Sequence, residues 1–332
     1  LPEYVVLTFI MMLGFYILLR AFGISAWLAG VGGIIWAFSS YFFILIPAGH
    51  IWKFVTLAYI PPTIAGIVLA YRRKYLLGGI ITALFIALQI RSNHIQMSYY
   101  FMFVILFIIG AYFEEAYKKK ELTHFFKASA ILALAAMVGV CINLSNLYHT
   151  YEYSKETMRG KSELKQEGNA ANQTSSGLDR DYITNWSYGI GETLTLLVPN
   201  VKGGASSDNL SQSETAMEKA NPMYSSIYSQ FPQYFGDQPW TAGPVYVGAF
   251  VMFLFVLGCF IVKGPLKWAL LGATIFSVLL SWGKNFMGLT DFFIDYVPMY
   301  NKFRAVSSIL VIAEFTIPLL AIFALKEILG RP

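Results

Sequence analysis

The sequence predicts an all-α polytopic membrane protein, and three observations support this class. Of its 332 residues, 56% are hydrophobic and only 13% are charged, whereas about a quarter of a soluble domain is charged. Apolar runs of about 17–25 residues recur, each long enough to cross a hydrocarbon core of about 30 Å. Because backbone groups in lipid must be hydrogen-bonded within the segment, such long apolar runs predict helices rather than barrel strands.

The apolar runs predict nine transmembrane helices, separated by short connections that are rich in charged or turn-forming residues. The first six follow one another closely, and a long polar segment separates them from the last three. A helical bundle with an outer loop subdomain would have this arrangement. The predicted spans are 4–20, 24–46, 54–71, 75–91, 95–113, 128–147, 242–262, 266–282 and 306–325.

Basic residues concentrate in alternate connections, and this pattern predicts the orientation. Cytoplasmic connections carry an excess of Lys and Arg. One alternating set contains Arg20, Arg72, Arg73, Lys74, Lys118, Lys119, Lys120, Lys127, Lys263, Lys267, Lys326 and Arg331, and the opposite short connections contain Lys53, Arg91, Lys284, Lys302 and Arg304. We therefore place the richer set in the cytoplasm, so that the chain starts outside and ends inside.

This orientation places residues 148–241 in one outer loop, which is too long for a simple connector and predicts a small outer subdomain. A second outer segment, 285–297, has apolar residues on one helical face and Asp291 and Asp295 on the other, which predicts a helix lying in the interface. The predicted divisions are 1–147 with six spans, 148–241 as the outer loop, and 242–332 with three spans.

The cysteines and the net charge exclude two classes of protein. Cys141 and Cys259 both fall inside predicted spans, where we expect buried, apolar thiols rather than a disulfide framework. The net charge of +5 is explained by basic residues that flank membrane spans. Nucleic acid is therefore not a predicted partner, and membrane lipids are.

Unusual polar residues gather in the outer connections, where the positive-inside rule disfavours cations. Their presence there indicates a local anionic partner. The clusters are His50 and Lys53 in PAGHIWKF, Arg91, His94 and Gln96 in QIRSNHIQMSYY, Trp186 and Glu192 in NWSYGIGETLTLLVPN, Asp237 in YFGDQPWTAGP, and Lys302 and Arg304 in PMYNKFRAVSS.

Each of these residues also has a purely structural interpretation, and for His50 and His94 it is a hydrogen bond at the membrane interface. Lys53 and Lys302 would extend their ammonium groups to lipid headgroups, the tryptophans would form an interfacial belt, and Asp237 would cap a turn. Asp291 and Asp295 fit a solvated helix face. Glu314 differs because it lies inside the last predicted span, where a carboxylate must be either protonated or paired within the bundle.

Taken together, the clusters favour a site for a lipid-linked phosphate that carries a sugar. Arginine binds phosphate oxygens with two prongs, and cations stabilise the charge that a leaving phosphate gains. We expect Lys53, Arg91, Gln96, Trp186, Lys302 and Arg304 to bind substrate. The candidates for proton transfer from an acceptor hydroxyl are His50, His94, Glu192 and Asp237.

The motifs GHIWKF, NHIQMSYY, NWSYGIGETLTLLVPNVKGG, YFGDQPWTAGPVYVG and VPMYNKFRAVSSILV resemble the YfhO family of bacterial membrane proteins over nearly the whole chain. The resemblance implies a GT-C-type glycosyltransferase of the bacterial cytoplasmic membrane. Such an enzyme takes a sugar from a polyprenyl-phosphate donor and transfers it outside to an envelope polymer or glycolipid. His50 and Lys53 would then face the donor phosphate, and Trp52 would anchor the loop at the interface.

The resemblance also implies one departure from the family pattern. GT-C enzymes carry their catalytic carboxylate in a large loop after the first span, and this chain enters the membrane at once. We therefore expect the chain to begin just after that loop, with the catalytic base upstream of it. Whether a divalent cation takes part is left open, and no metal site is predicted. A transporter or flippase of lipid-linked saccharides and a non-catalytic envelope assembly protein are the alternatives.

Overall fold

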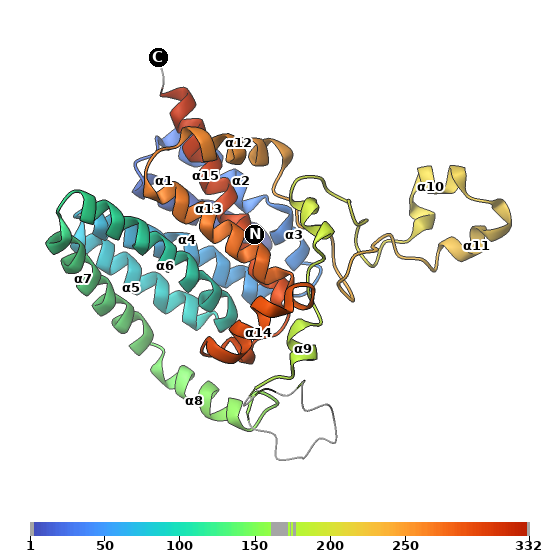
Figure 1. The fold of residues 1–332 in the computed structure, drawn as a ribbon, viewed down its shortest axis with the longest axis horizontal. Coiled ribbons are helices and arrows are strands. Elements are labelled where there is room, and N and C mark those ends of the chain that lie inside the picture. The colour runs from blue at the N-terminus through green and yellow to red at the C-terminus, as the bar shows by residue number, and fades with distance from the viewer. Residues whose placement is uncertain (1–2, 161–171, 173, 175–176, 331–332) are drawn as a thin grey trace.

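The computed structural model describes residues 3–160, 172, 174 and 177–330, and it is a bundle of helices (Figure 1). Every regular element in these ranges is helical, and the two isolated β-bridges, Val201–Gly203 and Asn209–Pro232, extend into no strand. Several helices are long and apolar enough to cross a membrane. The prediction of an all-α polytopic membrane protein is therefore confirmed.

The chain forms fifteen α-helices in these ranges, and short 3₁₀ segments join some of them. The first half contains α1 Glu3–Ala21, α2 Ala26–Ala37, α3 Ser40–Leu45, α4 Ile51–Tyr71, α5 Tyr75–Arg91, α6 Ile95–Lys118, α7 Leu122–Cys141 and α8 Leu144–Lys155. The second half contains α9 Arg180–Thr184, α10 Glu214–Lys219, α11 Ser225–Tyr228, α12 Ala249–Ile261, α13 Pro265–Ser281, α14 Met287–Tyr296 and α15 Val311–Leu329.

Within the described ranges, six helical segments have the length and hydropathy of a membrane span, fewer than the nine predicted from sequence. They are Glu3–Ala21, Ala26–Leu45, Ile51–Tyr71, Ile95–Lys118, Leu122–Cys141 and Val306–Leu329. The other three predicted spans correspond to shorter helices, because α5 and α13 have 17 residues each and α12 has 13. At 1.5 Å per residue these helices are about 25 and 20 Å long, less than a hydrocarbon core of about 30 Å.

Two predicted spans are broken in the structure. The helix expected over 24–46 divides into α2 and α3 at Phe38 and Ser39. The helix expected over 128–147 instead forms α7, which ends at Cys141, and a separate α8. At the second break, the buried Asn143 amide donates to the Ala87 carbonyl of α5 at 2.9 Å, which favours a turn over a continued helix.

The predicted burial of the two cysteines is only partly correct. Cys259 is half-buried in α12, whereas Cys141 is exposed at the last residue of α7. Both thiols are free. The physical reason is that α7 lies at the edge of the bundle, so that its apolar outer face is available to lipid rather than packed against protein.

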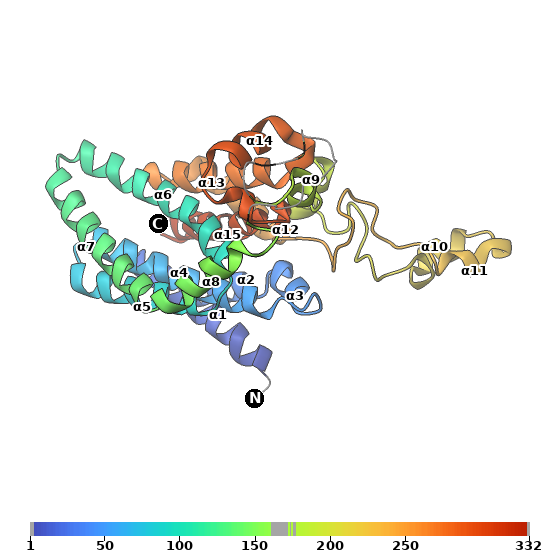
Figure 2. The same cartoon turned by 90° about the horizontal axis from the view of Figure 1, so that it is seen from below.

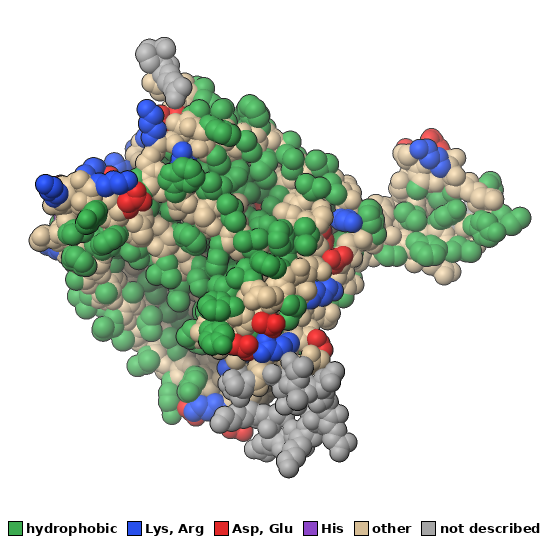
Figure 3. All heavy atoms as spheres, viewed as in Figure 1, with side chains coloured by type: hydrophobic (Ala, Val, Ile, Leu, Met, Phe, Trp, Pro, Cys, Tyr) green, Lys and Arg blue, Asp and Glu red, His purple; other side chains and the backbone are tan. Residues whose placement is uncertain are grey.

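Helices α4 and α15 form the centre of the bundle. In their most apolar stretches 83% and 89% of residues are buried, against 28% in α7. Aromatic rings fill the space beside α15, where Phe315 meets the edges of Phe15 and Trp36 at 5.7 and 5.5 Å. The surrounding helices expose apolar side chains, and Figure 3 shows a wide hydrophobic area with most Lys and Arg side chains toward its two ends.

The predicted outer subdomain, 148–241, has two parts in the structure. Leu178, Ile183, Tyr188 and Leu196 join the same buried core as the membrane helices. The part with α10 and α11 projects away from the bundle in both views (Figure 1, Figure 2), and α10 buries no residue. The described part of this loop therefore extends the bundle rather than forming a separate core. Residues 161–171 of the predicted loop lie outside the described residues.

The predicted interfacial helix 285–297 is present as α14, Met287–Tyr296, after a 3₁₀ turn over Gly283–Phe286. The segment Gly283–Tyr296, which contains α14, makes an angle of 108° with α13. Phe293 of its apolar face is buried, whereas Phe292 and Tyr296 are exposed. On the other face, Arg180 donates to Asp291 and to Asp295, each at 2.6 Å. The two aspartates keep the expected solvated face, with side chains 43% and 42% exposed, and in addition they hold α14 to α9.

Glycine sets the spacing of α4 and α5, and this predicts the effect of a mutation. A Cβ added at Gly78 would lie 2.6 Å from both the Ala70 nitrogen and the Gly66 carbonyl oxygen. Because small residues allow membrane helices to approach closely, we expect Gly78→Leu to lower the free energy of unfolding by about 1–3 kcal/mol. Thermal unfolding in detergent measures this. The matched control is Gly110→Leu in α6, which has no atom within 4 Å of its added Cβ, and equal melting of the two variants would contradict the prediction.

Candidate functional site

Four of the five polar clusters converge at one end of the bundle, which we call the outer end. His50 precedes α4, His94 precedes α6, and Arg304 lies in the turn before the 3₁₀ segment Val306–Leu310. The loop after α9 adds Trp186, whose carbonyl accepts from the Ser307 N–H at 3.0 Å. These connections alternate along the chain with the more basic ones. Their meeting at one end agrees with the prediction that alternate connections lie on the same face of the membrane.

Lys53 is the buried cation of this site. Its side chain lies in the first turn of α4 and the residue is 8% exposed. Its ammonium donates to the Ser308 hydroxyl at 3.0 Å and lies 5.7 Å from the centre of the Tyr41 ring. Within the described ranges it forms no ion pair. Because a buried charge is costly without a counter-charge, this site favours an added anion.

Arg304 lies at the same end, held by aromatic side chains. Its guanidinium donates to the Tyr182 hydroxyl at 2.7 Å and lies 5.5 and 5.9 Å from the Tyr182 and Trp186 ring centres. Gln96 donates to the Arg304 carbonyl at 2.7 Å. The group stays exposed and has no carboxylate partner among the residues that the structure describes. It therefore has free donors for an anion.

The backbone around Arg304 differs from the simple helix start that the sequence indicated. Ala305 has a φ of 57°, in the left-handed region, and a 3₁₀ segment precedes α15. Small side chains tolerate this conformation better than bulky ones. The Ser307 N–H is already bonded to Trp186, so it is not free for an anion. Side-chain donors, rather than the helix terminus, are the groups available to an anion here.

The two histidines are neutral bases rather than additional cations. Burial lowers the pKa of His50, and so do the nearby charges of Lys53 and Arg304. Burial and the charge of Lys53 lower the pKa of His94 to about 4. The Nδ1 atom of His94 is buried and has no hydrogen-bond partner among the described residues. A neutral imidazole beside two cations can accept a proton or a hydrogen bond from a ligand hydroxyl.

The lowered pKa of His94 predicts a pH dependence of stability. His94 takes up a proton near pH 6.5 in the unfolded chain but only near pH 4 in the folded protein. The folded state therefore keeps its full stability above pH 6.5 and loses part of it as the pH falls from 6.5 to about 4. We expect the free energy of unfolding of His94→Asn to fall less on acidification than that of the wild type, by about 1–2 kcal/mol after allowance for solvent screening. Thermal unfolding at pH 7.5 and 5 measures it. Identical pH profiles for the variant and the wild type would show that folding does not lower the pKa of His94.

Glu192 and Asp237 form a second group, next to the first. Both flank Gly189, and Trp186 connects the groups by donating to the Trp240 carbonyl at 3.1 Å. Glu192 is 2% exposed and accepts from the Gly189 N–H at 3.0 Å, the Tyr234 hydroxyl at 2.7 Å and Gln238 at 3.0 Å. Burial and this bond to Glu192 raise the pKa of Tyr234. Glu192 is thus placed to hold the loop together.

Asp237 is the more accessible of the two carboxylates. It is exposed, and one of its oxygens accepts from Asn285 at 3.0 Å. The other carboxylate oxygen has no bond within the part of the chain that the structure describes. Asp237 is therefore better placed than Glu192 to take a proton from an acceptor hydroxyl.

Two predicted substrate-binding residues do not join the site. Lys302 donates to the Arg159 carbonyl at 2.6 Å, and Arg159 donates to the Lys302 carbonyl at 3.0 Å. Burial lowers the pKa of Lys302. Arg91 is exposed at the end of α5 and forms no hydrogen bond or ion pair with the described residues. Lys302 therefore binds the segment that follows α8, and Arg91 lies outside the group of contacting side chains.

Glu314 lies within the bundle below this end, fully buried. One carboxyl oxygen accepts from the Ser39 hydroxyl at the break between α2 and α3. Its other oxygen has no hydrogen-bond partner in the described ranges, and neither have the Tyr41 hydroxyl and the Trp36 nitrogen. The sequence left two alternatives for Glu314, a protonated carboxyl or a partner within the bundle. The structure shows a partner, and among the described residues this partner is the Ser39 hydroxyl and not a cation.

Sequence reasoning missed Tyr182 as a partner of Arg304 and Arg180 as a partner of Asp291 and Asp295. Tyr182 stands four residues before Trp186, and this spacing of aromatics was the available signal. Arg180 gave no local signal, because its two partners lie 111 and 115 residues away.

A metal centre is not evident in the described residues, in which no group of three His, Cys, Asp or Glu side chains is placed to hold an ion. Comparisons of the chain with protein-family models, with curated proteins and with solved structures find no match. The site's own chemistry is therefore the basis for a functional proposal.

Proposed function

We propose that the chain belongs to a GT-C-type membrane glycosyltransferase, related to the YfhO family. It would take a sugar from a polyprenyl-phosphate donor and transfer it to an envelope polymer or glycolipid at the outer face of the bacterial cytoplasmic membrane. The observation that carries the proposal is the pair Lys53 and Arg304, which lie at one end without a carboxylate partner among the described residues. A phosphate at the membrane face supplies the missing negative charge.

The proposal assigns a role to each group of the site. The Arg304 guanidinium binds phosphate oxygens with two prongs, and Lys53 adds a point charge from the protein side. When the sugar–phosphate bond breaks, both cations stabilise the charge that the phosphate gains. The Trp186 and Tyr182 rings next to Arg304 offer apolar faces to a sugar. His50 and His94, or Asp237, would relay the acceptor proton.

A flippase of lipid-linked saccharides is the second candidate, and one observation favours it. A groove of about 930 Å³ runs between α4, α5, α6 and α7. Its lining extends from Pro298 and Met299 near the outer end to Tyr71 and Phe125 near the other end. Most of the lining is apolar, and the polar exceptions include Thr63, Thr82, Gln89, Ser98 and Ser129. A hydrated saccharide would lose most of its hydrogen bonds there, so we favour the enzyme.

One reconstitution experiment tests the proposal against both alternatives. The full-length protein is placed in liposomes with polyprenyl phosphate that carries a radiolabelled hexose, and with an envelope fraction as acceptor. A glycosyltransferase moves the label to the acceptor and leaves free polyprenyl phosphate. A flippase changes the side of the intact donor without breaking the bond. An assembly protein does neither, and either of these last results would overturn the proposal.

We further propose that α5, α12 and α13 complete nine membrane crossings with the N-terminal end outside. Each is apolar, and α5 packs against α4 through Gly66 and Gly78. A short helix can cross where the bilayer thins or where neighbouring helices cover its ends. The alternation of basic connections requires all nine, because each omitted crossing would move a basic connection to the wrong side.

Cysteine labelling checks this topology. In a background with Cys141→Ser and Cys259→Ala, we expect a membrane-impermeant maleimide to label Ser226→Cys from outside and Lys119→Cys only after permeabilisation. Ser226 lies in the projecting part of the loop, and Lys119 follows α6. With the N-terminal end outside, six crossings without α5, α12 and α13 would place Lys119 outside and Ser226 inside, which is the reverse of the nine-span arrangement. Labelling of both from the same side would refute the nine-span arrangement.

A further inference from the structure

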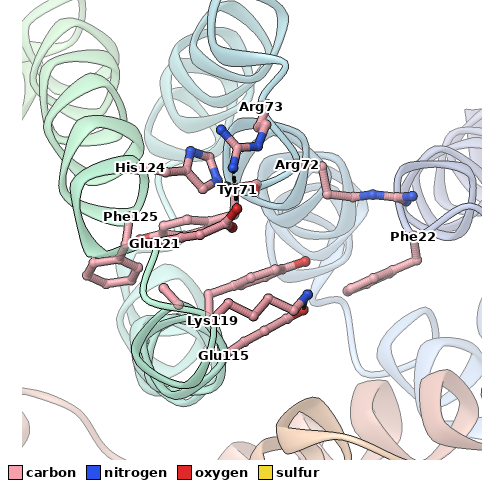
Figure 4. Close-up of a pocket in the computed structure, with 11 residues that line it drawn as sticks. Phe22, Tyr71, Arg72, Arg73, Glu115, Lys119, Glu121, His124 and Phe125 are labelled. Atoms are coloured by element: carbon pink, nitrogen blue, oxygen red, sulfur yellow. Dashed lines mark hydrogen bonds and ion pairs between the residues drawn. The ribbon is translucent and has the colours of Figure 1, made fainter.

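A pocket opens at the opposite end of the bundle, which we call the inner end. It has a volume of about 410 Å³ and lies between the connections that follow α1, α4 and α6. Figure 4 shows Arg72 and Phe22 on one side, His124, Glu121 and Phe125 on the other, and Lys119 with Glu115 along the base. The basic residues of the sequence predict that this end faces the cytoplasm.

The pocket has one cation that no carboxylate neutralises. Arg73 pairs with Glu121 at 2.7 Å, and Lys119 pairs with Glu115 at 2.5 Å. Arg72 is different, because its guanidinium donates to the Ala21 carbonyl at 2.5 Å and it has no ion pair among the described residues. One guanidinium prong is therefore used, and the remaining donors are free for a planar, two-pronged ligand such as phosphate.

The pocket lies beside the inner end of the apolar groove between α4 and α7. Tyr71 and Phe125 line both, and their rings stack with centroids 5.3 Å apart, so these two side chains form the boundary between the pocket and the groove. On α7 the groove lining runs from Phe125 to Val140, about 22 Å along the helix axis at 1.5 Å per residue. A cationic pocket next to the end of an apolar groove of this length is complementary to an amphiphile rather than to a soluble ion.

We propose that this pocket and groove bind an anionic glycerophospholipid of the inner leaflet. Its phosphate lies on the Arg72 guanidinium, and one acyl chain lies in the groove beside α7. This inference does not depend on glycosyl transfer, because it concerns the opposite end of the bundle from Lys53 and Arg304.

Two physical arguments support this occupant. First, cytoplasmic leaflets are rich in anionic lipids, which basic residues at that face attract. The pairs of Arg73 and Lys119 need not break, because Arg72 alone provides the two-pronged contact. Secondly, an unfilled groove in a bilayer loses packing contacts, and an acyl chain that enters from the inner leaflet restores them.

Photo-cross-linking tests the proposal on the full-length protein in mixed vesicles. The probe is phosphatidylglycerol with a diazirine on one acyl chain, and mass spectrometry maps the cross-linked peptides. We expect labelling of α7 residues that line the groove, such as Ala133 and Ala136. Arg72→Gln should weaken labelling about tenfold, while Arg72→Lys should keep part of it because the charge remains.

Matched variants separate the pocket from general surface charge. Lys74→Gln removes a neighbouring cation that does not line the pocket, and it should leave labelling unchanged. Ala133→Trp should block labelling because it fills the groove, whereas Leu134→Trp points to lipid beside it and should not. A phosphatidylcholine probe that labels equally well would overturn the proposal. Full competition by inorganic phosphate alone would also overturn it, because the pocket would then hold a soluble anion.

Discussion

Replacing Arg304 with alanine is expected to lower sugar transfer by the full-length protein about 30- to 150-fold. This range corresponds to about 2–3 kcal/mol of transition-state stabilisation, the scale of one well-placed charged donor. Donor binding should fall less than turnover, because the phosphate gains negative charge only as the sugar leaves. Turnover and donor affinity, measured separately, test both statements.

The structure explains why lysine should replace Arg304 only in part. The guanidinium is positioned by the Tyr182 hydroxyl and by the Tyr182 and Trp186 rings. An ammonium keeps the charge but loses the second prong and the planar contact with the rings. We therefore expect Arg304→Lys to retain an intermediate rate.

Two controls make the Arg304 result specific. Lys219→Ala removes an exposed cation from the projecting part of the outer loop, and it should not change transfer if only local charge matters. Tyr182→Phe removes the hydroxyl that holds the guanidinium and should reduce the rate less than Arg304→Ala. Wild-type turnover in Arg304→Ala would contradict a role in phosphate binding and would show that Arg304 only anchors the chain at the interface.

Lys53→Met is expected to raise stability while it lowers donor binding, and these opposite signs identify a functional cation. Methionine keeps most of the length of the stem but removes a buried charge that has no ion pair in the described ranges. Replacement of a buried charge by an apolar residue of similar volume is often stabilising by about 1–3 kcal/mol. Loss of one charge from the phosphate site should weaken donor binding at least about tenfold.

The control for Lys53 is its hydrogen-bond partner. Ser308→Ala removes the hydroxyl that the ammonium contacts at 3.0 Å but leaves the charge in place, so donor binding should fall only slightly. A Lys53→Met protein that is less stable and binds donor normally would contradict the proposal. It would show that Lys53 serves the packing of α4 against the 3₁₀ segment Val306–Leu310.

The sequence predicted the helices better than their ends. Uniform apolar runs identify spans because lipid excludes unpaired backbone groups, and this argument needs no tertiary information. The breaks at Ser39 and Asn143 were not predictable in the same way. Each depends on a polar partner in another helix, Glu314 in α15 and the Ala87 carbonyl in α5, which no local pattern reveals.

For the candidate site, too, the sequence predicted the location of the segments but not the contacts of their side chains. The connections that hold His50, His94 and Arg304 could be placed at one end from the sequence, because successive crossings alternate between the two faces. Which side chains meet there could not be predicted. Lys53 and its partner Ser308 are 255 residues apart, and Gln96 and the Arg304 carbonyl are 208 apart.

Sequence alone determined that this is a helical membrane protein with cationic and aromatic residues gathered in alternate connections. Hydropathy and charge sorting act segment by segment, so a linear reading is sufficient for them. Only the tertiary structure decided that Glu192 is a buried acceptor that joins parts of the outer loop, that Arg180 bridges Asp291 and Asp295, and that Arg72 lines a pocket next to an apolar groove. Burial and pairing depend on how distant helices pack, and side-chain chemistry gains its meaning from those neighbours.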